Sequence, residues 1–126
     1  KKGCEVGECG ACNVLIDGEA FNSCIYLAVW AEGKHIRTLE SLLGPNGEFS
    51  DIQQAFIEET AIQCGFCSPG FMLSAMEILE SGKEYTDEQL RKLLSGHLCR
   101  CTGYENILRA VRKVMYRRLG KELPEA

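Results

Sequence analysis

Eight cysteines are the residues of this sequence with the most chemistry to offer, and they fall into two sets of four. The first set, spaced C-x4-C-x2-C-x11-C, consists of Cys4, Cys9, Cys12 and Cys24. The second set, spaced C-x2-C-x31-C-x-C, consists of Cys64, Cys67, Cys99 and Cys101. Such close neighbours are poor disulfide partners, because a disulfide requires suitable Cα separations and side-chain directions. Close spacing suits a metal centre, since one tight turn can aim two thiolates at one point. We therefore expect two metal centres.

Iron–sulfur clusters and zinc are the two candidates for these centres. The first set has the C-x4-C-x2-C…C arrangement of plant-type 2Fe–2S proteins, with Cys24 as the fourth ligand. Zinc also accepts four thiolates, but zinc ribbons usually pair two C-x2-C knuckles, and neither set does so. The spacing favours clusters over zinc, more strongly for the first set. A Rieske centre needs two histidines, and only His97 lies near a cysteine. We expect His97 to be a surface or helix-capping residue.

The first part of the chain is predicted to contain short strands. Asn13–Ile16 has the pattern of a strand, residues 17–18 are Asp-Gly, a favoured two-residue hairpin turn, and Glu19–Asn22 returns. Residues 35–39 alternate like another short strand. The run Gly-Pro-Asn-Gly at residues 44–47 is the strongest helix and strand breaker in the sequence, so we place a domain boundary there.

After this boundary the apolar residues follow helical spacing. The four predicted helices cover about residues 51–61, 69–81, 87–94 and 104–119. Ser50 and Ser68 are predicted N-caps, and Thr86 opens a capping box with Gln89. Short helices with brief connections indicate a small bundle. The second cysteine set precedes two of these helices, whose N-termini would stabilise an anionic cluster.

Composition excludes several classes of protein. The chain has 126 residues, a formal net charge of −4, 45% hydrophobic residues and 25% charged residues. These values are ordinary for a soluble globular protein and argue against disorder and against nucleic-acid binding. We find no run of roughly 20 apolar residues, so we expect no membrane span. Basic residues concentrate after residue 104, which we interpret as a solvated helix face, with a docking face as the alternative.

The cysteine motifs resemble those of one known family. The stretches KKGCEVGECGACNVLIDG, NSC, QCGFCSPG and LCRCTGY are similar to the iron–sulfur subunit of the molybdenum hydroxylases, the xanthine dehydrogenase, aldehyde oxidoreductase and carbon monoxide dehydrogenase family. The resemblance implies an α+β fold. Residues 1–46 would be a plant-type ferredoxin-like β-grasp domain, and residues 47–126 a four-helix-bundle domain that binds the second 2Fe–2S cluster. Family members begin with a hairpin and helix before the first cysteine, so we expect only part of the β-grasp sheet here.

The resemblance also implies ligands and neighbours. The first four cysteines would hold a cluster on the side of FAD, and the second four a cluster on the side of molybdenum. Gln63 and Cys101 match positions that approach the molybdopterin cofactor in the family. We expect no catalytic residue in this chain. The implied partners are a large molybdopterin-binding subunit and an FAD-binding subunit or domain, assembled as a dimer of heterotrimers, without nucleic acid or membrane.

The predicted function is therefore electron transfer from the molybdopterin site through two 2Fe–2S clusters to FAD. A purine such as xanthine is the favoured substrate of the whole enzyme, because SCIYLAVWAEGKHIRTLE looks nearest to xanthine-dehydrogenase-type subunits. Aldehydes, carbon monoxide and N-heterocycles are alternatives. A free ferredoxin-like carrier and a two-site zinc interaction module are the rival functions. Thiolates and reduced clusters require a reducing compartment, so we expect a cytoplasmic protein.

Overall fold

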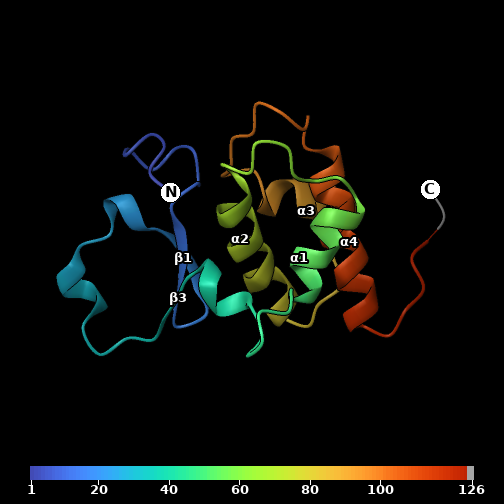
Figure 1. The fold of residues 1–126 in the computed structure, drawn as a ribbon, viewed down its shortest axis with the longest axis horizontal. Coiled ribbons are helices and arrows are strands. Elements are labelled where there is room, and N and C mark those ends of the chain that lie inside the picture. Colours follow the sequence, from blue (N-terminus) through green and yellow to red (C-terminus); the bar gives the residue numbers. More distant parts are fainter. Residues whose placement is uncertain (125–126) are drawn as a thin grey trace.

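A small three-stranded sheet packs against one of four helices (Figure 1). The computed structural model describes residues 1–124. The strands are β1 (Asn13–Ile16), β2 (Glu19–Asn22) and β3 (Ile36–Arg37), and the helices are α1 (Asp51–Glu58), α2 (Ser68–Glu80), α3 (Asp87–Leu93) and α4 (Glu105–Arg118). The α+β class predicted from the sequence is therefore confirmed. The division into domains at residues 46 and 47 stays a prediction.

The sheet is antiparallel, with β1 between β2 and β3. Asp17 and Gly18 connect β1 to β2, and both have positive φ values, 49° and 84°. Positive φ at both central residues is the conformation that matches the right-handed twist of a hairpin, which explains the Asp-Gly pair. The predicted hairpin is confirmed residue by residue. β3 is shorter than predicted, because only Ile36 and Arg37 pair with β1.

Between β2 and β3 the chain makes a wide excursion away from the helices (Figure 1). It contains two short 3-10 turns, η1 (Ser23–Ile25) and η2 (Ala28–Ala31). Large apolar side chains are exposed along this segment: Ile25, Leu27, Val29 and Trp30. Apart from these 3-10 turns, residues 23–35 form neither an α-helix nor a β-strand.

The predicted helices are present, and two of the three predicted caps are confirmed. Ser50 and Thr86 each form a complete capping box with the glutamine three residues later. The prediction of Ser68 as an N-cap is wrong. Cys67 occupies the N-cap position of α2, and Ser68 is already the first helical residue, buried and without a capping hydrogen bond. The turn that carries Cys67 therefore leads directly into the helix.

One hydrophobic core joins the sheet to the helices. Leu15 of β1 and Leu42 belong to the same buried cluster as Phe56 of α1, Phe71 of α2 and Val111 of α4. α2 lies at the centre of this arrangement, since it contacts both β1 and β2 on one side and α1 and α4 on the other. Among residues 1–124, no helix combines the length and the apolar character that a membrane crossing requires.

The basic residues near the C-terminus form ion pairs within the chain. Their partners come from α1, from α3 and from the loop between α2 and α3: the pairs are Arg112–Asp87, Lys113–Glu58, Lys113–Glu59, Arg117–Glu58, Arg118–Asp51 and Lys121–Glu84. These pairs are partly exposed, so each contributes little stability. They favour the interpretation of a solvated helix face over a docking face for a partner.

α2 approaches the first cysteine loop very closely at Gly70. A Cβ atom added at Gly70 would lie 2.1 Å from the carbonyl oxygen of Gly10 and 3.2 Å from the Cα of Ala11. Both obstacles are backbone atoms, which cannot turn away as a flexible side chain does. The absence of a side chain at Gly70 therefore fixes how near the loop lies to the helix.

We expect Gly70→Ala to destabilise the protein by about 1–3 kcal/mol, because the methyl group would force the loop away from the helix. Alanine has a higher helix propensity than glycine, so helix propensity alone predicts that the substitution stabilises the protein. Chemical denaturation of the full-length protein measures the change in the free energy of unfolding. Gly96→Ala is the matched control, since a Cβ there meets nothing within 4 Å. Equal stability of the two variants would contradict the prediction.

Candidate metal centres

The first set of cysteines lies on a loop whose backbone N–H groups point at sulfur. Three amides donate to the Sγ of Cys4: those of Val6, Glu8 and Cys9, at 3.4, 3.2 and 3.3 Å. The Val6 amide, followed by those of Cys9 and Glu8, lowers the pKa of the Cys4 thiol to about 6. Glycines at positions 7 and 10 adopt positive φ, which lets the loop turn its amides inward. This loop therefore favours a thiolate at Cys4.

The thiols of the first set meet in two pairs. Cys4 contacts the thiol of Cys9, and Cys12 contacts the thiol of Cys24. The amide of Cys24 also donates to the Sγ of Cys12 at 3.4 Å. Cys24 is brought to this place by the hairpin, because it follows β2 directly. The prediction that the fourth thiol comes from beyond the hairpin agrees with this placement.

The second set meets in the same manner, with thiol contacts between Cys64 and Cys101 and between Cys67 and Cys99. All four cysteines border one hollow of about 670 Å³ at the surface. Cys64 and Cys101 are exposed, whereas Cys67 is buried at the start of α2. Burial raises the pKa of the Cys67 thiol to about 12. A cationic metal in the hollow would therefore be needed to hold Cys67 as a thiolate at neutral pH.

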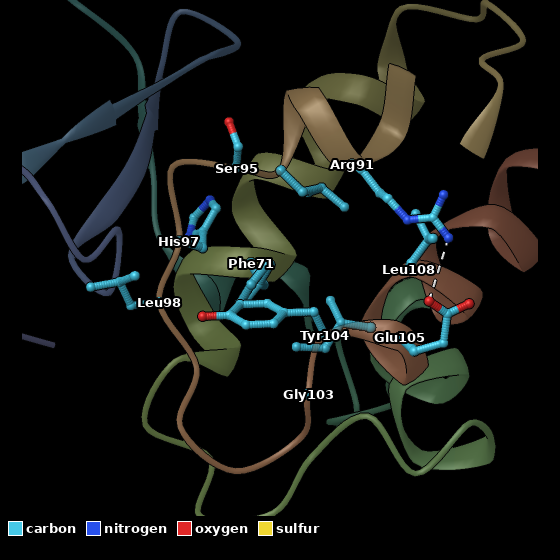
Figure 2. A pocket seen from close by; sticks show the side chains of 11 residues that line it. Phe71, Arg91, Ser95, His97, Leu98, Gly103, Tyr104, Glu105 and Leu108 are labelled. Atoms are coloured by element: carbon cyan, nitrogen blue, oxygen red, sulfur yellow. Dashed lines mark hydrogen bonds and ion pairs between the residues drawn. The ribbon is translucent and has the colours of Figure 1, made fainter. Parts of the chain in front are cut away.

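Two residues missed by the sequence analysis hold Cys99 in place. The Tyr104 hydroxyl accepts the Cys99 amide hydrogen at 3.0 Å, and the Thr102 amide donates to the Cys99 Sγ at 3.4 Å. Tyr104 has a φ of 72°, a conformation that is costly for a residue with a bulky side chain. Figure 2 shows its ring next to Phe71, on the wall of a second cavity of about 400 Å³. The sequence feature that could have drawn attention to both residues is the Thr-Gly-Tyr run at residues 102–104, directly after the last cysteine.

The paired thiols fit a binuclear cluster. All eight cysteines are free thiols, so no disulfide competes for them. A 2Fe–2S cluster has two irons, and each iron takes two cysteine thiolates. Two pairs in each set, with amide donors directed at the sulfurs, supply that number of ligands.

The two cysteine loops contact each other directly. The Leu98 amide, next to Cys99, donates to the carbonyl oxygen of Cys9 at 3.0 Å. Gly10 lies against the same segment, because a Cβ there would lie 2.6 Å from the carbonyl oxygen of Gly96. In Figure 1 the N-terminal loop and the loops around residues 60–67 and 95–104 lie near one another at the upper end of the molecule. Both candidate centres therefore share one end of the fold.

The prediction that His97 is a surface or capping residue is wrong. His97 is only 4% exposed and stacks on Phe71 with ring centroids 4.4 Å apart (Figure 2). Its Nε2 lies 2.7 Å from the Ser74 hydroxyl, which also accepts from the Asn13 side chain at 2.8 Å. Burial lowers the pKa of His97 to about 4, so the ring is neutral at physiological pH. His97 thus joins the first cysteine loop, α2 and the second set.

Gln63 is exposed immediately before Cys64. Cys101 is also exposed and borders the same hollow as Cys64. This exposure leaves both residues accessible to another subunit. Their predicted approach to a molybdopterin cofactor stays a prediction.

Comparison with known proteins agrees with this geometry. Residues 38–112 match the family described as a 2Fe–2S binding domain. The xanthine dehydrogenase iron-sulfur-binding subunit of Escherichia coli O157:H7 is 51% identical over 113 residues, which cover 88% of this chain and 70% of that subunit.

Solved structures give the same result. Quinoline 2-oxidoreductase from Pseudomonas putida 86 superimposes with a TM-score of 0.87 and 42% identity, covering 94% of this chain and 74% of that chain. The aldehyde oxidoreductase of Desulfovibrio gigas gives a TM-score of 0.89 and 36% identity, over 97% of this chain and 14% of that one. On its cysteine motifs, its fold and these similarities, the chain belongs to the family of 2Fe–2S iron–sulfur subunits of the molybdenum hydroxylases.

Proposed function

We propose that this chain carries electrons from a molybdopterin-binding subunit to an FAD-binding subunit or domain. The observation that carries the proposal is the meeting of two four-cysteine sets at one end of the fold, where the Leu98 amide donates to the carbonyl oxygen of Cys9. When bound, the two 2Fe–2S clusters supply one-electron redox chemistry. No residue here is proposed as a general acid, base or nucleophile, so the chain alone should not turn over a substrate.

The proposed ligands are the two sets as predicted from the sequence. Cys4, Cys9, Cys12 and Cys24 would hold the cluster towards FAD, and Cys64, Cys67, Cys99 and Cys101 the cluster towards molybdenum. The chain supplies more than sulfur. Backbone amides stabilise the charge on Cys4, and Thr102 does the same for Cys99. Tyr104 orients the main chain of Cys99.

The surface supports a permanent complex over a free carrier. Around the second set, Phe66, Leu98 and Tyr104 are 45%, 60% and 44% exposed, respectively, beside the exposed sulfurs of Cys64 and Cys101. Exposed apolar side chains gathered in one place are typical of a subunit interface. We infer that Gln63 and Cys101 face the molybdopterin cofactor across this interface. The proposed assembly is a dimer of heterotrimers in the cytoplasm.

The first of three predictions about function concerns metal content. We expect anaerobically purified full-length protein to be brown, to contain four irons and four sulfides, and to show two distinct EPR signals when reduced. Copurification of a molybdopterin subunit is expected, whereas a monomer without one would favour the free carrier. Colourless protein containing zinc but no acid-labile sulfide would refute the proposal and support the zinc module.

The second prediction concerns removal of the metal. In cluster-loaded protein we expect all eight thiols to resist iodoacetamide. After iron is removed with a chelator at pH 7, Cys4 should react first, because its pKa of about 6 leaves it mostly thiolate, and Cys67 last, because its pKa is about 12. Mass spectrometry of the labelled peptides measures the order. The control is denatured chain, where this order should disappear. Rapid labelling of any of the eight in loaded protein would remove it from the ligand set.

The third prediction concerns the substrate of the whole enzyme. We propose a purine such as xanthine, and a xanthine dehydrogenase subunit is among the similar proteins, at 51% identity. Aldehydes, carbon monoxide and N-heterocycles are the alternatives, since proteins named for quinoline and for aldehydes are also similar to this chain. Steady-state turnover of the assembled enzyme should be fastest with xanthine, compared with quinoline and an aliphatic aldehyde at equal concentrations. A preference for either of the others would reject the purine and leave the electron-transfer role intact.

A further inference from the structure

A lysine beside the first cysteine set reaches across to the loop of the second set. The Nζ of Lys1 donates to the carbonyl oxygen of Gly65 at 2.7 Å and lies 5.3 Å from the centre of the Phe66 ring. Gly65 and Phe66 are the two residues between Cys64 and Cys67. Lys1 itself stands only three residues before Cys4. Its positive charge therefore lies beside the turn between Cys64 and Cys67, which belongs to the other cysteine set.

The position of Lys1 is fixed by its surroundings. Its main-chain nitrogen donates to the carbonyl oxygen of Ala11 at 3.0 Å, which anchors the start of the loop. Gly3 packs against the ring of Phe66, since a Cβ at Gly3 would lie 3.4 Å from that ring. Phe66 thus lies against both Gly3 and the Lys1 ammonium group. The next residue, Lys2, differs completely: its side chain is 79% exposed and pairs with Glu5 at 3.4 Å.

The charge of Lys1 lies beside the second cysteine set. Its ammonium group contacts Gly65 and Phe66, the two residues that join Cys64 to Cys67. A positive charge stabilises any gain of negative charge near it. A 2Fe–2S cluster held by four thiolates becomes more negative by one charge when it is reduced. The ammonium group must therefore stabilise the reduced form more than the oxidised form.

We propose that Lys1 raises the reduction potential of the cluster held by the second cysteine set. This inference rests on the proposed function, because it requires both clusters. It assigns to Lys1 a role as a positioning and charge-bearing residue across the two loops. Lys1, which precedes the first cysteine set in the sequence, would thereby adjust the difference in reduction potential between the two clusters.

The test is an EPR-monitored redox titration of the full-length protein in its complex. Lys1→Gln is compared with Lys2→Gln, which removes the same charge one residue away. Substitution of Cys101 by serine identifies the EPR signal of the second set. At the potential that half-reduces this cluster in the natural protein, we expect Lys1→Gln to lower the ratio of reduced to oxidised cluster by about three- to tenfold. Tenfold corresponds to about 59 mV for one electron.

Three outcomes decide the inference. Lys1→Arg should keep the natural potential if charge is the cause, so a shift equal to that of Lys1→Gln would reject the electrostatic role. No shift in Lys1→Gln, or an equal shift in Lys2→Gln, would also reject it. A natural protein that lacks a second 2Fe–2S signal would instead reject the proposed function. Retention of both EPR signals in Lys1→Gln confirms that the variant is folded and loaded.

Discussion

The contact between the first cysteine loop and the helical part is the constraint on which the rest of this structure depends. Gly10 lies between Gly70 of α2 and the segment at residues 96–98, at distances that leave no room for a side chain at either glycine. The same contact contains the hydrogen bond from Leu98 to Cys9. Electron transfer between two centres falls steeply with their separation. A fold that carries electrons therefore needs its two cysteine sets held at a constant distance, and backbone-to-backbone packing provides this.

Both cysteine sets also face the problem of concentrating negative charge. Four thiolates in one place repel one another, and the metal alone does not remove the excess charge. In the first loop, three backbone amides donate hydrogen bonds to the Sγ of Cys4 and so offset this charge. The second set places Cys67 at the start of α2, where the positive end of the helix dipole lies. It also has the hydroxyl and amide of Thr102 beside Cys99.

The sequence predicted the elements with strong local signals and failed where tertiary contacts decide. The hairpin through Asp17 and Gly18 and the capping boxes at Ser50 and Thr86 follow from short-range chemistry, and all three are present. His97 was misjudged because a single histidine in a polar loop carries no sign of burial; Phe71 and Ser74, more than twenty residues away, bury it. Tyr104 was missed because its hydrogen bond to Cys99 depends on a positive φ at Tyr104, and the Thr-Gly-Tyr run indicates a turn without predicting that contact.

The substrate lies outside what this chain can encode. In fold, the chain resembles proteins named for quinoline and for aldehydes almost equally well, with TM-scores of 0.87 and 0.89, and in sequence it resembles one named for xanthine. Some residues hold thiolates, some cap helices, and others pack the two loops together. All of them serve electron transfer irrespective of the molecule that is oxidised. The side chains of Gln63 and Leu98 are exposed beside the second set and have none of these roles. Under the proposed function, the substrate is bound by the partner, and these exposed side chains are the part of this chain that can vary with it.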